Sequence, residues 1–447
     1  MMTNQLFIET YGCQMNVYDS GIVKKLFLND GFTLAASEDT SDVILINTCA
    51  IRERAQERIY SRLQSLYPLK KRKPNLVVGI IGCMAQNLGN ELFAMGFPID
   101  VVLGPDNYRN LPAIIKDIQS NSNKKFQLTR ISSTEVYDDI EPEVIEGCSA
   151  FVTIMRGCNN FCSFCVVPYT RGRERSRSPQ SIIKEINHLI EKFNIKEVTL
   201  LGQNVNSYKF ENFDFTDLIQ LILDQTNIQR IRFTSPHPHH FPKKLIRLMS
   251  QEKRFCSSIH LPLQSGSTKI LKRMHRDYTK EEYLELVNYI RQEIPEVGLT
   301  TDIIVGFSGE TEEDFQETLE MVKEVKFNMA YMFYYSEREH TLAKKKYPDD
   351  VPIDVKIKRL NELIDLQSDV SKEKNKKEIG KCFEVLIEGK SKKSDKEWMG
   401  RTNHGKVVVF PDPEEKFKIG DFVTTKITNA TKATLLGTVL EGAFVNS

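Results

Sequence analysis

Six apolar runs, each followed by a stretch of helical periodicity, dominate the middle of this chain. Apolar runs that alternate with amphipathic helices are typical of a parallel sheet covered on both faces. The six pairs span fewer residues than the roughly 250 of a complete eight-unit barrel. The sequence therefore predicts a six-unit open barrel, whose gap would admit a large substrate. The expected strands are residues 151–156, 197–202, 230–234, 258–263, 299–305 and 329–335, and the expected helices are residues 180–193, 216–226, 242–251, 268–292, 312–325 and 355–378.

The first 120 residues repeat this alternation on a smaller scale. A cysteine follows each expected strand almost at once, namely Cys13, Cys49 and Cys83. The carboxyl ends of parallel strands share one edge of a sheet, where ligands bind, so these thiols are expected to converge on a metal or cluster site. Cysteines packed at turns by coincidence are the alternative. The expected strands are residues 5–10, 42–47 and 76–82, and the expected helices are residues 17–28, 51–66 and 111–119.

A tighter cysteine pattern stands at the start of the expected barrel. Cys158, Cys162 and Cys165 form a C-x₃-C-x₂-C run directly after its first strand. Four-iron clusters ordinarily take four thiolates, so three thiolates leave one iron open to a substrate or cofactor. A zinc site without its histidine, or a set of buried structural thiols, would use the same residues.

The C-x₃-C-x₂-C run resembles the signature of the radical S-adenosylmethionine (SAM) family, and the N-terminal cysteines resemble those of its methylthiotransferase branch. The N-terminal motifs that match are residues 11–16 (YGCQMN), 47–52 (NTCAIR) and 82–86 (GCMAQ). The resemblance implies two [4Fe–4S] clusters, one on each set of three cysteines and each with an open iron. It also implies SAM as a cofactor, which that family splits at the barrel cluster to give a 5′-deoxyadenosyl radical.

Short strands replace helices after about residue 380. Five strands are expected, at residues 382–388, 400–402, 406–410, 421–427 and 435–440. They predict a small β-barrel of a kind often used on oligonucleotides, which resembles the TRAM domain, an RNA-binding module. The fold class is therefore α/β with a C-terminal small β-barrel. The expected domains are 1–120 (N-terminal parallel α/β cluster domain), 121–149 (linker), 150–379 (open (β/α)₆ radical SAM barrel ending in a solvated connecting helix) and 380–443 (TRAM β-barrel).

Composition limits the partners and the compartment. The net charge of +1 predicts no bulk attraction to nucleic acid, so RNA binding must come from local patches. The chain has nine cysteines and no signal-peptide-like or long apolar segment. This composition favours the cytoplasm, thiols used for metals, and no membrane; we also expect a monomer. Cys148, Cys256 and Cys382 are expected to be ordinary packed or surface thiols.

Residues near the cysteines are candidates for RNA and SAM contacts. Four arginines follow the barrel cysteines and suit RNA phosphates or local carboxylates: Arg171, Arg173, Arg175 and Arg177. By family position the strand ends face SAM, although ordinary turn chemistry would favour the same residue types. The cofactor-binding residues expected on this basis are Gln203, Asn204, Gln264, Ser265, Asp302 and Gly306. Residues 236–240 (PHPHH) hold three imidazoles, but the family has a related segment there without a metal.

The stretch at residues 166–177 resembles the branch that acts on tRNA adenosine. This resemblance implies methylthiolation of C2 of N6-isopentenyladenosine at position 37 of the tRNA anticodon stem-loop. SAM would serve as radical source and methyl donor, and sulfur would be delivered at the auxiliary N-terminal cluster. An aromatic C2–H has no acidic proton and no leaving group, so it suits radical chemistry, and a loop base is readily splayed out. An electron donor such as flavodoxin or ferredoxin is expected; the sequence does not define the sulfur donor.

Three other functions use the same motifs. Two are sister reactions, methylthiolation of threonylcarbamoyladenosine 37 in tRNA or of an aspartate on a ribosomal protein. The third is a non-enzymatic iron–sulfur RNA-binding sensor, which would bind clusters without cleaving SAM. Two departures from the family pattern lie at expected strand ends: Glu339 and His340 replace the usual Pro-Gly, and Ser308 replaces a Pro. They affect loop shape and substrate fit and leave both cysteine sets intact.

Overall fold

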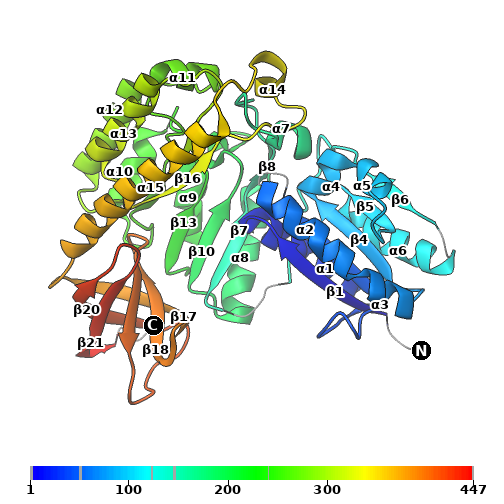
Figure 1. Cartoon of the computed structure of the whole chain (residues 1–447). Coiled ribbons are helices and arrows are strands. Elements are labelled where there is room, and N and C mark those ends of the chain that lie inside the picture. The colour runs from blue at the N-terminus through cyan, green and yellow to red at the C-terminus, as the bar shows by residue number, and fades with distance from the viewer. Residues whose placement is uncertain (1–3, 50–52, 122–123, 144–146, 240, 445–447) are drawn as a thin grey trace.

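The computed structural model describes residues 4–49, 53–121, 124–143, 147–239 and 241–444 of the 447-residue chain. These residues form an N-terminal sheet with its helices, an open barrel and a small closed barrel (Figure 1). The predicted α/β class with a C-terminal β-barrel is confirmed. Among the described residues, every helix is too short or too polar to span a lipid bilayer.

The N-terminal sheet is wholly parallel, with strand order β2-β1-β3-β4-β5-β6. Every residue of β3 and β4 is buried, because Val43 and Leu45 point into one helix-covered layer and Ile44 and Ile46 into the other. The strands are β1 Gln5–Tyr11, β2 Thr33–Leu34, β3 Val43–Thr48, β4 Val77–Gly82, β5 Val101–Leu103 and β6 Phe126–Leu128. The helices are α1 Gln14–Asn29, α2 Glu53–Ser65, α3 Tyr67–Arg72, α4 Cys83–Leu88, α5 Glu91–Ala94, the 3₁₀ helix η1 Tyr108–Asn110 and α6 Leu111–Ser120.

The three strands predicted in this region are confirmed, whereas β2, β5 and β6 were not predicted. β6 lies within residues 121–149, which the sequence suggests as a linker, and it pairs in parallel with β5. Strands of only two or three residues carry too little periodicity to be detected in a sequence. The start of the expected helix 51–66 lies outside the described residues, and the remainder corresponds to α2, Glu53–Ser65.

The open barrel consists of two parallel three-stranded sheets, β7-β10-β13 and β14-β15-β16. A parallel bridge between Ile231 and Phe255 connects them. All six predicted strands are confirmed: β7 Ser149–Thr153, β10 Glu197–Leu201, β13 Arg230–Phe233, β14 Ser258–His260, β15 Gly298–Val305 and β16 Met329–Tyr334. Short elements around the barrel are β8 Met155–Arg156, α7 Val167–Thr170, β9 Arg175–Ser176, η2 Val205–Ser207, β11 Lys209–Phe210, β12 Phe213–Asp214 and α14 Leu342–Lys346.

The barrel helices match the predicted pattern with two exceptions. They are α8 Pro179–Phe193, α9 Phe215–Gln225, α10 Lys243–Gln251, α11 Thr268–Arg273, α12 Lys280–Glu293, α13 Glu312–Val325 and α15 Ile353–Lys376. The single helix predicted over residues 268–292 is wrong, because Thr279 caps a new helix and forms a reciprocal capping box with Glu282. The turn between the two helices contains His275 in the left-handed conformation, at φ 57°.

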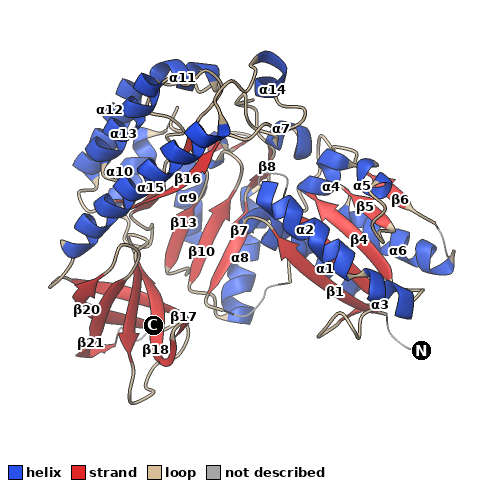
Figure 2. Ribbon diagram, in the orientation of Figure 1, coloured by secondary structure: helices blue, strands red, loops and turns tan. Residues whose placement is uncertain are grey.

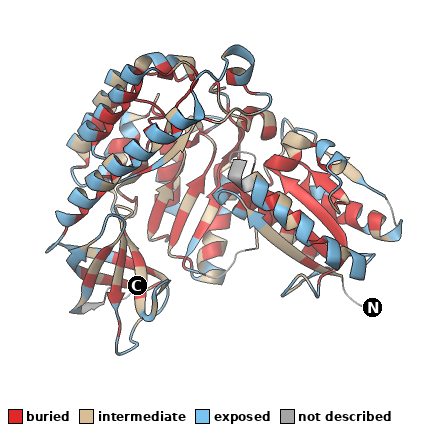
Figure 3. Cartoon of the chain, in the orientation of Figure 1, coloured by how far each residue is buried: buried red, intermediate tan, exposed pale blue. Residues whose placement is uncertain are grey.

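The second exception is α15, which was predicted to be solvated. One face of this helix is buried against β16 and α13 (Figure 3). That face is mostly polar, which hides it from a hydropathy pattern, and comprises Lys356, Arg359, Leu363, Gln367, Ser371 and Asn375. Arg359 donates to Glu310 at 3.0 Å, so the burial is stabilised by ion pairing rather than by apolar contact alone.

The C-terminal barrel is closed, with strand order β17-β18-β19-β21-β20. Its strands are β17 Cys382–Ser391, β18 Ser394–Thr402, β19 Val407–Pro411, β20 Phe422–Ala430 and β21 Leu435–Phe444, so the predicted five-stranded barrel is confirmed. Trp398 packs in its core and donates its indole N–H to Asp412 at 2.9 Å. The small barrel lies at the amino ends of the open-barrel strands, where Arg230 donates to the Arg401 carbonyl at 2.7 Å (Figure 2).

The contact between the two barrels is close enough to be tested by adding one methyl group. A Cβ on Gly298, the first residue of β15, would lie 2.1 Å from the His404 carbonyl oxygen. We expect Gly298→Ala to lower the free energy of unfolding by about 1–3 kcal/mol, measured as a lower urea midpoint. Gly389→Ala is the matched control, since a Cβ there meets no atom within 4 Å. Equal midpoints for the two variants would show that the barrels are not packed this closely.

Candidate functional site

Three thiols lie at the carboxyl edge of the N-terminal sheet. Cys13 follows β1 and caps α1, Cys49 follows β3, and Cys83 follows β4 as the first residue of α4. Because β1, β3 and β4 are adjacent and parallel, their ends bring the three residues together. A hydrogen bond from the Cys49 thiol, with the nearby Arg171 cation, lowers the pKa of Cys13 to about 6. This favours the thiolate, which is the form that binds metal.

The second set of thiols lies in the loop between β8 and α7. Cys158 is buried, whereas Cys162 and Cys165 are partly exposed. The Asn160 and Val167 amides donate to the sulfurs of Cys158 and Cys165, both at 3.5 Å. Burial and the neighbouring thiols raise the pKa of Cys158 to about 11 and that of Cys165 to about 12. These thiols therefore need a positively charged ligand to release their protons.

The two sets of thiols lie next to each other. Cys83 packs against Val166, which directly follows Cys165, and α4 packs on α7 (Figure 1). All nine cysteines are described, and none of them forms a disulfide. Within the described residues, no three His, Cys, Asp or Glu side chains are arranged to hold a single metal ion. The fit to iron–sulfur clusters thus rests on donor chemistry, since each set offers three thiols with amide or guanidinium donors to sulfur.

Arginine donors complete both sets. Arg171 donates to the sulfur of Cys83 at 3.2 Å, and Arg276 donates to the sulfur of Cys162, also at 3.2 Å. Arg276 was not predicted as a site residue, because it lies within the expected continuous helix 268–292. The capping box at Thr279 and Glu282 was the available signal that this segment is a turn.

A buried carboxylate connects the N-terminal sheet to the open barrel. Asp19 of α1 is fully buried and accepts from Arg156 at 2.6 Å and from Arg171 at 2.8 Å. Although burial favours its neutral form, the two guanidiniums hold the pKa of Asp19 below its usual value. Neither Asp19 nor Arg156 was predicted to have a role, because partners more than 100 residues apart leave no local pattern.

Arg171, Arg175 and Arg177, for which RNA phosphates or local carboxylates were the expected partners, all pair with carboxylates. All three are buried, with at most 8% of their surface exposed. Besides the Arg171 contacts, Arg175 pairs with Asp106 at 3.0 Å and Arg177 pairs with Glu185 at 2.6 Å. Through Arg171 and Arg175, the arginine run therefore connects the barrel to the N-terminal region.

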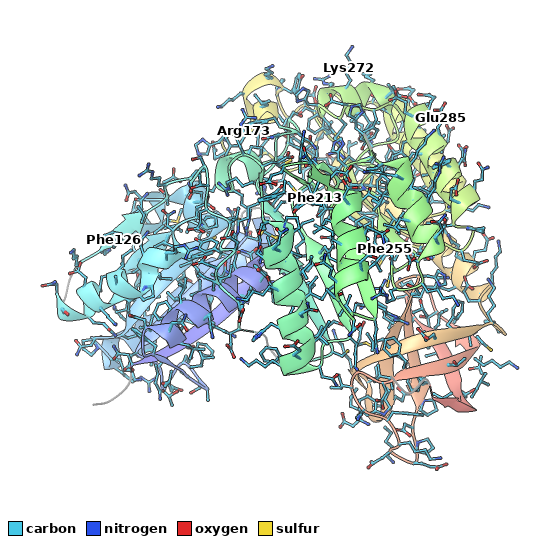
Figure 4. The ribbon with its side chains drawn as sticks, turned by 180° about the vertical axis from the view of Figure 1, so that it is seen from behind. Phe126, Arg173, Phe213, Phe255, Lys272 and Glu285 are labelled. Carbon is cyan, nitrogen blue, oxygen red and sulfur yellow. The ribbon has the colours of Figure 1, made fainter. Side chains whose placement is uncertain are left out.

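Arg173 differs from its three neighbours because it is exposed. Its guanidinium lies over the Phe161 ring, 4.2 Å from the centroid, and Figure 4 shows it at the molecular surface near α7. A cation above an aromatic face beside the barrel cysteines is a suitable platform for a nucleic acid base and its phosphate.

Four of the six residues expected near SAM have features suited to a polar ligand. Gln203 accepts from the Gly157 amide, next to Cys158. Asn204 lines a polar cavity of about 230 Å³ together with Asn159, Glu174 and His237. The side-chain oxygens of Asn204 and Gln264 are buried without a hydrogen-bond partner in the described structure, and Ser265 is fully buried beside Gln264. Unpaired buried oxygens are rare and indicate a missing ligand or water.

The other two expected residues have other partners. The Asp302 carboxylate lies 3.2 Å from Nε2 of His260, and Nδ1 of the same ring lies 3.0 Å from the Thr300 hydroxyl. Gly306 packs against Lys356 of α15, and its amide donates to Glu310 at 2.7 Å. Ser308 is fully buried, Glu339 and His340 are exposed, and His240 of the PHPHH stretch lies outside the described residues.

Known proteins match nearly all of this chain. Residues 152–322 match the Radical SAM superfamily, residues 376–440 match the TRAM domain, and residues 5–104 match the uncharacterized protein family UPF0004. The tRNA-2-methylthio-N(6)-dimethylallyladenosine synthase of Azobacteroides pseudotrichonymphae genomovar. CFP2 is 47% identical over 97% of this chain and 96% of its own. The protein of the same name from Chloroherpeton thalassium is 47% identical over 98% of this chain and 96% of its own.

Two solved structures share the fold at low sequence identity. The radical SAM methyltransferase TsrM from Kitasatospora setae, solved with cobalamin and a [4Fe–4S] cluster, is 12% identical with a TM-score of 0.53 over 74% of this chain and 75% of its own. The cobalamin-dependent SAM radical enzyme OxsB gives 13% identity and a TM-score of 0.55 over 81% and 56%. At these identities the likeness concerns the fold alone.

Proposed function

Because the chain belongs to the tRNA-2-methylthio-N6-dimethylallyladenosine synthases, a family of radical SAM methylthiotransferases, we propose that it places a methylthio group on C2 of N6-isopentenyladenosine 37 in tRNA. We further propose that the six cysteines of the two triads carry the reaction. The observation that best supports these roles is the contact between Cys83 and Val166, which sets the two thiol triads side by side. A sulfur atom and a radical must meet at one base, so the two centres must be neighbours.

The residues that hold the cofactors follow from the two triads. Cys158, Cys162 and Cys165 would hold the barrel cluster, and Cys13, Cys49 and Cys83 would hold the auxiliary one. When bound, the barrel cluster supplies the electron for SAM cleavage and the auxiliary cluster supplies a place for sulfur. The unpaired oxygens of Asn204 and Gln264 would accept hydrogen bonds from SAM, and the buried Asp19 ion pairs would hold the two centres at a fixed separation.

The RNA would contact two separate surfaces of the protein. Arg173 over Phe161 lies beside the barrel cysteines, whereas the TRAM domain docks at the opposite end of the barrel strands, on Arg230 and Gly298. A tRNA held at both places would run along the outside of the open barrel. We propose the domain division 1–120, 150–379 and 380–443, with residues 121–149 between the first two. We also propose a cytoplasmic monomer that receives electrons from a flavodoxin or ferredoxin.

Mass spectrometry of a reconstituted reaction tests the proposed function. The protein is loaded anaerobically with iron and sulfide, then given SAM, dithionite and an anticodon stem-loop with N6-isopentenyladenosine at position 37. We expect that nucleoside to gain SCH₂, and the same RNA with plain adenosine to stay unmodified. SAM cleavage without RNA modification would show that N6-isopentenyladenosine 37 is not the substrate. RNA with threonylcarbamoyladenosine 37 and the ribosomal protein would then be tested in its place. Full cluster loading without SAM cleavage would favour the sensor function instead.

A further inference from the structure

Arg276 is a buried cation that has no carboxylate partner among the described residues. Only 8% of its surface is exposed. Its Nε donates to the Tyr278 hydroxyl and its Nη1 donates to the Cys162 sulfur, both at 3.2 Å. The Tyr278 hydroxyl is held in turn by the Pro262 and Leu263 carbonyls at the end of β14, each at 3.0 Å. An uncompensated buried charge is strongly destabilising, so this position favours an anion, and the ionisable group that the guanidinium faces is the Cys162 thiol rather than a carboxylate.

Arg171 presents the same arrangement at the other triad. It is buried and donates to the Cys83 sulfur at 3.2 Å and to Asp19 at 2.8 Å. Asp19 also pairs with Arg156, so these two guanidiniums share one carboxylate, and the positive charge in excess of that carboxylate faces the Cys13 and Cys83 sulfurs. Each set of three thiols is therefore accompanied by one buried positive charge in excess of its carboxylates and one direct guanidinium-to-sulfur hydrogen bond.

That excess charge matches a cluster held by three cysteines. An oxidised [4Fe–4S] core with three thiolates carries a net charge of about −1, and uptake of one electron makes it about −2. We propose that each cluster has its own guanidinium, Arg276 at Cys162 and Arg171 at Cys83, which anchors the cluster and sets its reduction potential. Both are positioning residues, because they act on the cluster through a ligand cysteine.

The direction of the effect follows from electrostatics. A cation and a hydrogen bond at a ligand sulfur stabilise the more negative, reduced cluster more than the oxidised one. Each guanidinium therefore raises the potential of the cluster it touches and makes that cluster easier to reduce. Because each arginine contacts only one triad, the two potentials are set independently.

The test measures each cluster alone, without RNA. Cys13→Ala/Cys49→Ala/Cys83→Ala protein retains only the barrel cluster, and Cys158→Ala/Cys162→Ala/Cys165→Ala protein retains only the auxiliary one. In a redox titration monitored by electron paramagnetic resonance, Arg276→Gln should lower the midpoint potential of the barrel cluster by about 59 mV. For a one-electron couple this corresponds to about a tenfold fall in the reduced-to-oxidised ratio at fixed potential. Arg171→Gln should lower only the auxiliary midpoint.

Two further variants separate contact from general charge. Lys272→Gln removes one positive charge from the same segment at an exposed position (Figure 4) and should leave the barrel midpoint unchanged. Arg276→Lys retains the charge and should recover most of the shift. If Arg276→Gln takes up less iron, recovered loading in Arg276→Lys supports the proposal and equal failure overturns it.

Unchanged midpoints in loaded Arg276→Gln and Arg171→Gln, or equal shifts with Lys272→Gln, would also overturn the proposal. It rests on the cluster assignment made above. Parent proteins that bind no iron would refute that assignment, whereas loaded clusters with unmoved potentials would refute only the role of the arginines.

Discussion

Cys158→Ala should abolish both SAM cleavage and tRNA methylthiolation, whereas Cys49→Ala should abolish methylthiolation and leave SAM cleavage intact. The two residues belong to triads on different sheets, Cys158 beside β8 and Cys49 after β3, so each substitution removes a ligand from one cluster only. The loss should exceed the 10–100-fold typical of residues that merely orient a metal ligand. Chromatography of 5′-deoxyadenosine and mass spectrometry of the RNA report the two activities separately.

Cys256→Ala is the matched control for both variants. Cys256 is 1% exposed, against 8% for Cys158 and 7% for Cys49, and burial raises its pKa to about 11, but it belongs to neither triad. Both activities should survive its removal. If Cys158→Ala still cleaved SAM, the barrel triad would not hold the radical-generating cluster. If Cys49→Ala lost SAM cleavage as well, the two centres would not be independent.

Asp19→Asn should destabilise the apo-protein by about 3–5 kcal/mol, the usual cost of breaking a buried ion pair from one side. The substitution retains the shape of the side chain but leaves Arg156 and Arg171 buried without their shared negative charge. Urea unfolding under anaerobic, metal-free conditions measures the loss. Asp139→Asn is the control: Asp139 pairs with Arg109 at the surface and is 62% exposed, so its loss should cost at most about 1 kcal/mol.

The same carboxylate makes stability depend on pH in a defined direction. The pKa of Asp19 is lowered in the folded protein, so its contribution is present above the pKa of about 3.9 that an unfolded aspartate has. The contribution is lost as the pH falls through the lower folded-state value. Asp19→Asn should therefore narrow the stability difference between neutral and acidic pH. An unchanged pH profile would show that Asp19 is not charged in the folded protein.

The sequence determined the architecture wherever structure follows from short-range pattern. All six barrel strands overlap the expected apolar runs, and the small barrel has the five strands expected, although β18 begins at Ser394, six residues before the expected range 400–402. The position of each cysteine just past a strand, or within one short loop, was also readable, because parallel strands carry such residues to a common edge. The convergence of each cysteine set could therefore be predicted from the local sequence around each cysteine.

Only the tertiary structure decided what the charged residues do. Arg171, Arg175 and Arg177 have the composition of a phosphate-binding loop, yet they are buried against Asp19, Asp106 and Glu185. Arg276 gains its place beside Cys162 across more than 100 residues. The physical reason is that helices and strands form from patterns among residues that are close in sequence. Whether a charged side chain is buried, paired or exposed depends instead on the dielectric environment and the counter-charges that packing brings to it from distant segments.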